Sequence, residues 1–245
     1  MKRLLFSIKY DGTAYHGWQV QANARSVQQT FQDAVEAVFG KRLDVKGCSR
    51  TDSGVHANMY CLTLDTDMQI SAEGAVMALN TKLPQDIAVY DCREVPMDFH
   101  PRYSCTKKQY VYKIYNGAAR NPFWRNTAYY YRYPIDVEML NRAAEAFCGT
   151  HDFAGFCSVK SDVEDTVRTV YRAEVKRDGE LVLFTFEADG FLYNMVRIMV
   201  GTLLFVNEGK IAPESLAEVI DSKDRTRAGK TVQPQGLYLN KVFYD

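Results

Sequence analysis

Residues 4–12 read LLFSIKYDG and open the N-terminal half of the chain. From Leu4 to Tyr10 every second side chain is apolar, which is typical of a β-strand, and Asp11-Gly12 is a turn signal at its end. A helix is predicted next, because Ser26 and Gln29 form a capping box and an apolar stripe runs from there to Gly40. The chain therefore begins as an alternation of strands and helices.

The same order recurs in the second half, where Asp178-Gly179 joins a predicted hairpin. Both halves are predicted as β-α-β-β-α-β, the ferredoxin-like pattern that RNA-recognition modules also use. We expect an α+β fold with halves at residues 1–100 and 101–245, joined into one extended mixed sheet with a central active-site cleft. The predicted strands lie at residues 4–10, 43–45, 60–64, 87–90, 110–115, 167–177, 181–187 and 236–243, and the helices start at Val27, Ser71, Asp136 and Asn194.

Composition narrows the class of protein. The 245 residues include 30 Lys and Arg, 30 Asp and Glu, and 47% hydrophobic residues, so the chain can bury a full core and is not uniformly basic. Six single cysteines without a C-x-x-C pair favour reduced thiols and predict no metal site. The longest apolar stretch, residues 198–206, is about half of the ~20 residues that span a bilayer. We expect a cytoplasmic protein without a membrane partner.

The positive charge is concentrated between Phe99 and Ile135. This window holds seven cations, eight tyrosines and no Asp or Glu. Cations interleaved with aromatic faces are suited to phosphates and exposed bases, although a solvated strand with an aromatic core behind it is the alternative. The predicted RNA contacts are Arg102, Lys107, Lys108 and Lys113, and Lys41, Arg42, Lys46 and Arg50 can extend the basic track.

The loop at residues 47–57, GCSRTDSGVHA, carries most of the chemistry. It places an acid, a cation, hydroxyls and an imidazole between two predicted strands. One reading is structural: Asp52 and Ser53 close a turn, Gly54 supplies a positive φ, and His56 caps the next strand. A metal site is a weaker alternative, since the other histidines show no ligand spacing.

The residues 50–57, RTDSGVHA, resemble the signature of the tRNA pseudouridine synthase A (TruA) family. Further similar blocks follow in the family's order, which extends the resemblance along the whole chain. They are YDGT at residues 10–13, YHGWQ at 15–19, K-x-Y-x-Y at 108–112, GFLYNMVR at 190–197, AGKT at 228–231 and GLYL at 236–239. The chain departs from the family's usual residues at Ser49, Met59-Tyr60, Pro101 and Gln233.

The resemblance implies that the chain isomerises uridine to pseudouridine at positions 38, 39 and 40 of tRNA, in the anticodon arm. It implies no cofactor, and a homodimer that spans the RNA. Asp52 occupies the family's catalytic position, where a carboxylate can act as a nucleophile and divide one hard step into two. Whether Asp52 attacks the sugar or the base, or abstracts a sugar proton, stays open.

Other site residues follow from the same resemblance. Arg197 matches the arginine that supports the ionised acid, and it is also the only charge between Asp189 and Glu208, although a purely structural ion pair is the alternative. Tyr110 is expected to stack on the target uracil, unless it is simply a sheet tyrosine. Arg50 and His56 are expected to hold RNA or to help extrude the nucleotide. Leu237 is expected to pack on the base, and a core leucine is its alternative.

Two other functions compete with a tRNA-modifying isomerase. A non-catalytic RNA-binding protein would use the same two halves, and a small-molecule glycosyl hydrolase would use Asp52 on a free nucleoside. The basic aromatic window disfavours the hydrolase, and the signature together with Arg197 disfavours the non-catalytic protein.

Overall fold

The computed structural model describes residues 1–158 and 165–244, which group into two compact units. Unit 1 comprises residues 1–106 and 238–245, and unit 2 comprises residues 107–237. The chain thus leaves unit 1 once and returns to it with its last strand. The division into domains at residue 100 stays a prediction.

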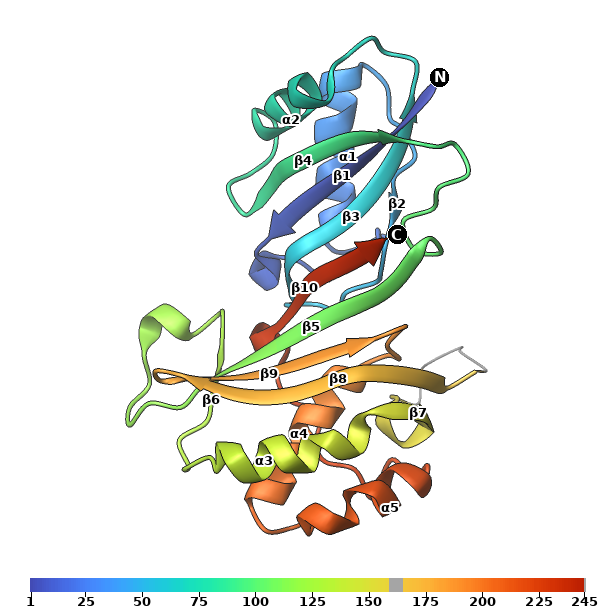
Figure 1. Cartoon of the computed structure of the whole chain (residues 1–245). Coiled ribbons are helices and arrows are strands. Elements are labelled where there is room, and N and C mark those ends of the chain that lie inside the picture. The colour runs from blue at the N-terminus through green and yellow to red at the C-terminus, as the bar shows by residue number, and fades with distance from the viewer. Residues whose placement is uncertain (159–164, 245) are drawn as a thin grey trace. The chain divides into compact units, whose positions relative to one another are not determined.

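Unit 1 is a sheet with two helices (Figure 1). Its strand order is β4-β1-β3-β10, in which β1 is antiparallel to both neighbours and β10 is parallel to β3. The short β2 pairs with β3. The elements are β1 (Lys2–Tyr10), α1 (Val27–Phe39), β2 (Lys46–Gly47), β3 (His56–Thr66), α2 (Ala72–Asn80), β4 (Ile87–Val95) and, except for its first residue, β10 (Leu237–Tyr244), with a 3-10 turn at Gly12–Ala14.

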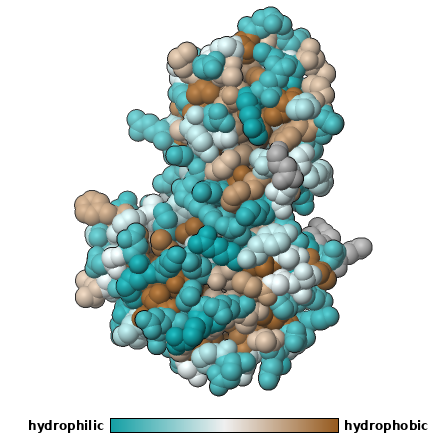
Figure 2. All heavy atoms as spheres, viewed as in Figure 1, coloured by the Kyte–Doolittle hydropathy of each residue, from teal (hydrophilic) through white to brown (hydrophobic). Residues whose placement is uncertain are grey.

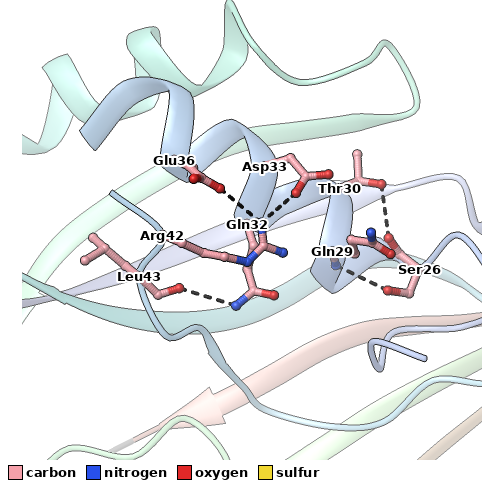
Figure 3. Close-up of polar contacts among 8 residues, drawn as sticks. All are labelled: Ser26, Gln29, Thr30, Gln32, Asp33, Glu36, Arg42 and Leu43. Carbon is pink, nitrogen blue, oxygen red and sulfur yellow. Dashed lines mark hydrogen bonds and ion pairs between the residues drawn. The ribbon is translucent and has the colours of Figure 1, made fainter. Parts of the chain in front are cut away.

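The start and end of α1 follow from its sequence. The Ser26 hydroxyl accepts the N–H of Gln29 at 3.2 Å, as the capping box predicts (Figure 3). Gly40 ends the helix with a φ of 73°, a left-handed conformation that favours glycine. The helix buries one stripe of apolar residues, as predicted, which consists of Val27, Phe31, Ala34, Val35 and Phe39.

The strands of unit 2 have the order β5-β9-β8-β7, in which consecutive neighbours are antiparallel. The two-residue β6 runs parallel to β5. The elements are β5 (Cys105–Tyr115), β6 (Tyr129–Tyr130), α3 (Val137–Ala144), β7 (Gly149–Asp152), β8 (Val167–Asp178), β9 (Leu181–Ala188), α4 (Met195–Asn207) and α5 (Leu216–Asp221), together with 3-10 turns at Pro122–Trp124, Glu145–Phe147, Ala154–Phe156, Pro213–Ser215 and Pro234–Gly236.

The core of unit 2 lies between its sheet and its helices. Helix α4 is buried along almost its entire length, as its continuous apolar run predicts. Phe147 contacts both Phe156 and Phe186 edge-to-face, which links the segment after α3 to the sheet. On the face that Figure 2 shows, hydrophilic residues surround scattered apolar ones. Apolar side chains on this face therefore occur mostly in small groups.

The sequence predicted the α+β class and the order of the longer elements correctly, but the short strands β6 and β7 were not predicted. Residues 43–45 are a wrong prediction, because the short strand lies at Lys46–Gly47. Gly47 allows this pairing: a Cβ there would overlap the Tyr60 hydroxyl and press on the Trp18 ring. The six cysteines are free thiols, as predicted. Within the described residues, no helix is long and apolar enough to cross a membrane.

Candidate active site

Asp52 lies at the start of a tight turn in the loop between β2 and β3. Its carbonyl oxygen accepts the N–H of Val55 at 3.1 Å, and Gly54 has a φ of 76°. The side chain of Asp52 is half-buried, whereas its neighbours Arg50 and Ser53 are exposed. The predicted turn is therefore present, and it presents the carboxylate at the edge of the protein surface.

The turn is fixed against the segment that follows β1. The Tyr10 hydroxyl bonds to that of Thr51 at 2.8 Å, and the backbone N–H of Trp18 donates to the Thr51 carbonyl at 3.1 Å. Gly54 donates to the carbonyl of Tyr15 at 3.2 Å. Three motif blocks that are separate in the sequence, YDGT, YHGWQ and RTDSGVHA, thus form one hydrogen-bonded structure.

Two glycines make this close approach possible. A Cβ at Gly12 would overlap the backbone carbonyl of Val55, and one at Gly17 would overlap that of Thr51. Gly17 also has a φ of 86°, which side chains rarely adopt. The YDGT and YHGWQ blocks are therefore the backbone support of the Asp52 loop.

His56 is buried beneath this loop, with 2% of its surface exposed. Its Nδ1 accepts the N–H of Gly12 at 3.1 Å, and its ring stacks on Tyr238 with 4.6 Å between ring centres. Asp11 Oδ1 also lies 3.1 Å from Nδ1. The role of His56 as an RNA contact stays a prediction.

Tyr60 supports the start of the loop. Its hydroxyl donates to the carbonyl of Ser49, and its ring stacks on Trp18 at 4.0 Å. The family departure at Ser49 therefore lies in a backbone held by two aromatic residues. The next residue, Arg50, is exposed. This exposure is compatible both with an RNA contact and with a cation that is simply solvated.

In unit 2, Tyr110 lies on β5 and is 6% exposed. Its ring contacts Phe191 edge-to-face at 5.0 Å, so the K-x-Y-x-Y and GFLYNMVR blocks meet. The neighbouring Tyr112 is buried, which raises the pKa of its hydroxyl well above its usual value, and it donates to the Gln233 carbonyl at 2.6 Å. Tyr110 stays the predicted uracil-stacking residue.

Arg197 is anchored in the first turn of α4. Its Nη1 donates to Asn194 Oδ1 at 2.6 Å, and its Nε donates to the Val232 carbonyl at 2.8 Å. Asn194 in turn donates to the Ser158 hydroxyl at 2.8 Å and has a φ of 63°. The sequence predicted that Arg197 needs a partner but not that Asn194 provides one. Asn194 and Arg197 are three residues apart, and this spacing on a helix could have predicted the contact between their side chains.

One turn further along α4, the backbone of Gly201 is packed against the AGKT block. A Cβ on Gly201 would overlap the Lys230 carbonyl, and one on Gly229 would overlap the Gly201 carbonyl. The hydroxyl of Thr202 accepts the N–H of Gly229 at 2.8 Å. Val232, which directly follows the AGKT block, accepts a hydrogen bond from Arg197. The packing of Gly201 against this block therefore helps to determine where the guanidinium of Arg197 lies.

Leu237 is the first residue of β10 and is 6% exposed. The preceding Gly236 lies so close to Tyr112 that a Cβ would be 2.7 Å from its ring. This burial fits both a core leucine and a residue that packs on a bound base, so the second interpretation stays a prediction.

The four predicted RNA-binding cations differ in environment. Arg102 is exposed beside the Tyr103 ring, whereas Lys107 bonds to Glu187 at 2.9 Å. Lys108 is 9% exposed, and burial lowers the pKa of Lys113. Of these four, Arg102 is the one that presents an exposed charge. The RNA-binding roles of all four stay predictions.

Two of the other four cations of the predicted basic track, Lys41 and Arg42, have acidic partners. Arg42 bonds to Asp33 at 2.8 Å and to Glu36 at 3.2 Å (Figure 3), and Lys41 bonds to Asp67 at 2.8 Å. Their charge is therefore balanced locally, and this part of the track receives no support. Within the described ranges, no group of three or more His, Cys, Asp or Glu could hold a metal ion.

Comparisons with known proteins agree with the motifs that build these sites. A sequence profile of the family described as tRNA pseudouridine synthase matches residues 7–104 and 143–245. The chain belongs to this family. It is 44% identical to the tRNA pseudouridine synthase A of Caldicellulosiruptor bescii over 244 residues, covering 100% of both chains. It is also 44% identical to that of Geobacillus sp. strain WCH70 over 245 residues, covering 100% of this chain and 99% of the relative.

A solved structure described as a Cbf5-Nop10-Gar1 complex is more distant. One chain of it is 12% identical, with a TM-score of 0.37, over 82% of this chain and 53% of that one. This similarity is too low to support a conclusion.

Proposed function

We propose that the chain isomerises uridine to pseudouridine in tRNA, at positions 38, 39 and 40 of the anticodon arm, without a cofactor. The observation that carries the proposal is the rigid turn that presents Asp52 within the residues 50–57 signature. Membership of the tRNA pseudouridine synthase family supports the reaction, and the full-length relatives named tRNA pseudouridine synthase A support the substrate.

The reaction needs no oxidant or second substrate. The glycosidic bond between N1 and C1′ breaks, a bond between C5 and C1′ forms, C5 loses its proton, and N1 gains one. We assign Asp52 as the nucleophile that holds the reacting fragment between the two bond changes. Its half-buried position restricts water around the carboxylate while leaving it accessible to a flipped nucleotide.

Arg197 is assigned to balance the negative charge of Asp52, which requires the two halves to complete one site. The anchors of Arg197 on Asn194 and Val232 favour this role because they fix a cation before substrate arrives. Tyr110 and Leu237 are assigned to the target base, and Arg50 to the phosphate backbone. His56, buried beneath the Asp52 loop, is assigned to position this loop, and the RNA contact that the family resemblance implies is the alternative. A homodimer in the cytoplasm would give the long tRNA enough surface.

The decisive experiment compares Asp52→Asn with the matched control Asp44→Asn, because Asp44 is an exposed aspartate outside the loop. Each variant is incubated with unmodified tRNA, and pseudouridine is mapped chemically along the anticodon arm. We expect the wild type and Asp44→Asn to modify positions 38–40, and Asp52→Asn to bind tRNA without modifying it.

Other outcomes separate the competing functions. Binding by the wild type without pseudouridine formation would indicate a non-catalytic RNA-binding protein. Release of free uracil would indicate a hydrolase. Full activity of Asp52→Asn would remove Asp52 from the mechanism.

A further inference from the structure

Residues 116–134, between β5 and α3, form a loop that the proposed catalytic role does not use. We call it the arginine-aromatic loop. It contains no Asp or Glu and carries three arginines, Arg120, Arg125 and Arg132, all exposed. It lies between the two ranges that the family profile matches, 7–104 and 143–245. Figure 1 shows it extending away from the strands of unit 2.

The base of the loop is held by defined contacts. Asn116 Nδ2 donates to the carbonyls of Tyr131 at 2.7 Å and Tyr133 at 2.9 Å, which ties the two ends together. Strand β6 pairs with β5 through Tyr129 and Tyr130. The loop is therefore a built structural element with a fixed base.

Its tip is also structured. Asn121 Oδ1 accepts the N–H of Phe123 at 3.0 Å and caps the 3-10 turn Pro122–Trp124, in which Pro122 restricts the backbone. The carbonyl of Trp124 accepts the N–H groups of Thr127 and Ala128 at 3.1 and 3.0 Å. These bonds hold the backbone of the tip in a defined turn.

The tip directs an aromatic ring into solvent. Phe123 is 91% exposed and adds little to the core. Exposed Arg120 and Arg125 flank it in the sequence, and Arg132 lies over the ring of Tyr133 at 4.9 Å. Within the described residues, no ion pair links these arginines to a carboxylate. An exposed ring among unbalanced cations is the chemistry that binds unpaired bases together with their phosphates.

We propose that the arginine-aromatic loop is a second RNA-binding site, at which Phe123 stacks on an unpaired base outside the reacting nucleotide and the arginines contact the adjacent phosphates. The proposal rests on the proposed function, since it takes tRNA as the ligand. Charge favours RNA as the ligand, because the loop is wholly basic and RNA carries a negative charge at every phosphate.

The test measures the Kd of unmodified tRNA at several salt concentrations for Phe123→Ala, Phe123→Trp, Phe123→Leu and the double variant Arg120→Gln/Arg125→Gln. The control is Tyr171→Ala, which removes another exposed aromatic residue, 54% exposed, from β8. Thermal unfolding and molar mass in solution are measured in parallel. The exposure of Phe123 predicts an unchanged Tm.

We expect Phe123→Ala and Phe123→Leu to weaken binding about 5- to 100-fold, and Phe123→Trp to retain it, because stacking needs an aromatic plane. The double arginine variant should reduce the slope of log K against log salt by roughly 1.5, while Phe123→Ala leaves the slope unchanged. Tyr171→Ala should bind as the wild type does.

Three results would overturn the proposal: unchanged binding by Phe123→Ala, full binding by Phe123→Leu, or a changed molar mass, which would make the loop a contact between copies. The proposed function is judged separately, by pseudouridine formation in the wild type. If Phe123→Ala loses tRNA binding but the wild type forms no pseudouridine, the second RNA-binding site is supported and the proposed isomerisation is rejected.

Discussion

His56 Nδ1 accepts a hydrogen bond from the backbone N–H of Gly12 at 3.1 Å, so an imidazole joins the Asp52 loop to the segment after β1. The family resemblance predicts an RNA contact at His56, whereas 2% exposure and stacking on Tyr238 favour a positioning role. The two roles predict different effects of substitution, because only the positioning role depends on an acceptor at Nδ1.

His56→Asn and His56→Gln separate these roles. The amide oxygen of Asn can take the place of Nδ1, whereas that of Gln reaches the place of Nε2. We expect His56→Asn to retain most of the turnover. His56→Gln should lower kcat for pseudouridine formation roughly 10- to 100-fold, because the loop loses its support. The Kd for tRNA should change little in either variant, and equal weakening of tRNA binding by both would favour the RNA contact instead.

Arg197→Met tests the proposed support of the Asp52 carboxylate. Loss of a fixed cation should lower kcat roughly 100-fold, while tRNA binding changes by less than about threefold. Asn194→Ala removes one anchor of the guanidinium and should give a smaller loss of kcat in the same direction. Single-turnover rates and Kd values for the two variants provide the check. Turnover at the wild-type level in Arg197→Met would restrict Arg197 to a structural role.

Gly201→Ala tests the contact between α4 and the AGKT block. The new Cβ meets the Lys230 carbonyl, which belongs to backbone and cannot rotate away. We expect the free energy of unfolding to fall by about 1–3 kcal/mol, measured by urea denaturation. Gly190→Ala is the matched control, since its Cβ meets only the flexible Arg168 side chain, at 3.2 Å. Equal free energies of unfolding for the two variants would show that α4 and the AGKT block can move apart with little loss of stability.

Asp65 predicts a pH dependence of stability in unit 1. Arg3 donates to both of its carboxylate oxygens, at 2.6 and 2.7 Å, and this hydrogen bonding lowers the pKa of Asp65 below its usual value of 3.8. The folded protein therefore holds the ionised form more strongly than the unfolded chain. Its stabilisation is complete above pH 4 and is lost as the pH falls through the folded pKa.

Asp65→Asn should reduce the free energy of unfolding by about 1 kcal/mol at pH 7. The difference from the wild type should shrink as the pH falls below 4, because Asp65 is protonated first in the unfolded chain and only at a lower pH in the folded protein. Urea denaturation between pH 7 and pH 3 measures it. A difference that stays constant over this range would mean that charge plays no part in the Arg3–Asp65 contact.

Local signals in the sequence predicted the elements well. Ser26 caps α1 and Gly40 ends it, and Gly179 adopts a φ of 58° in the predicted hairpin turn. Each of these features depends on neighbouring residues only. The turn at Asp52 belongs to the same group, since its glycine and its polar side chains are adjacent in the sequence.

The supports of the site could not be predicted in this way. Tyr238 stacks on His56 from a strand almost two hundred residues away, and Gly229 touches Gly201 across a loop. These contacts depend on the register of β3 and β10 and on how closely two backbone segments approach each other. Neither produces a periodic pattern in the neighbouring sequence. The error at residues 43–45 has the same origin, because apolar alternation suggested a strand where the close approach at Gly47 decides the pairing.

The return of β10 to unit 1 has a consequence for synthesis on the ribosome. Residues 238–244 emerge after the whole of residues 107–237, so in a nascent chain the start of β3, at His56 and Ala57, lacks its β10 partner until translation has passed unit 2. Until then the imidazole under the Asp52 loop also lacks its stacking partner. Completion of the Asp52 loop is therefore one of the last events in the life of the nascent chain, and a polypeptide arrested before residue 238 contains the signature without its finished support.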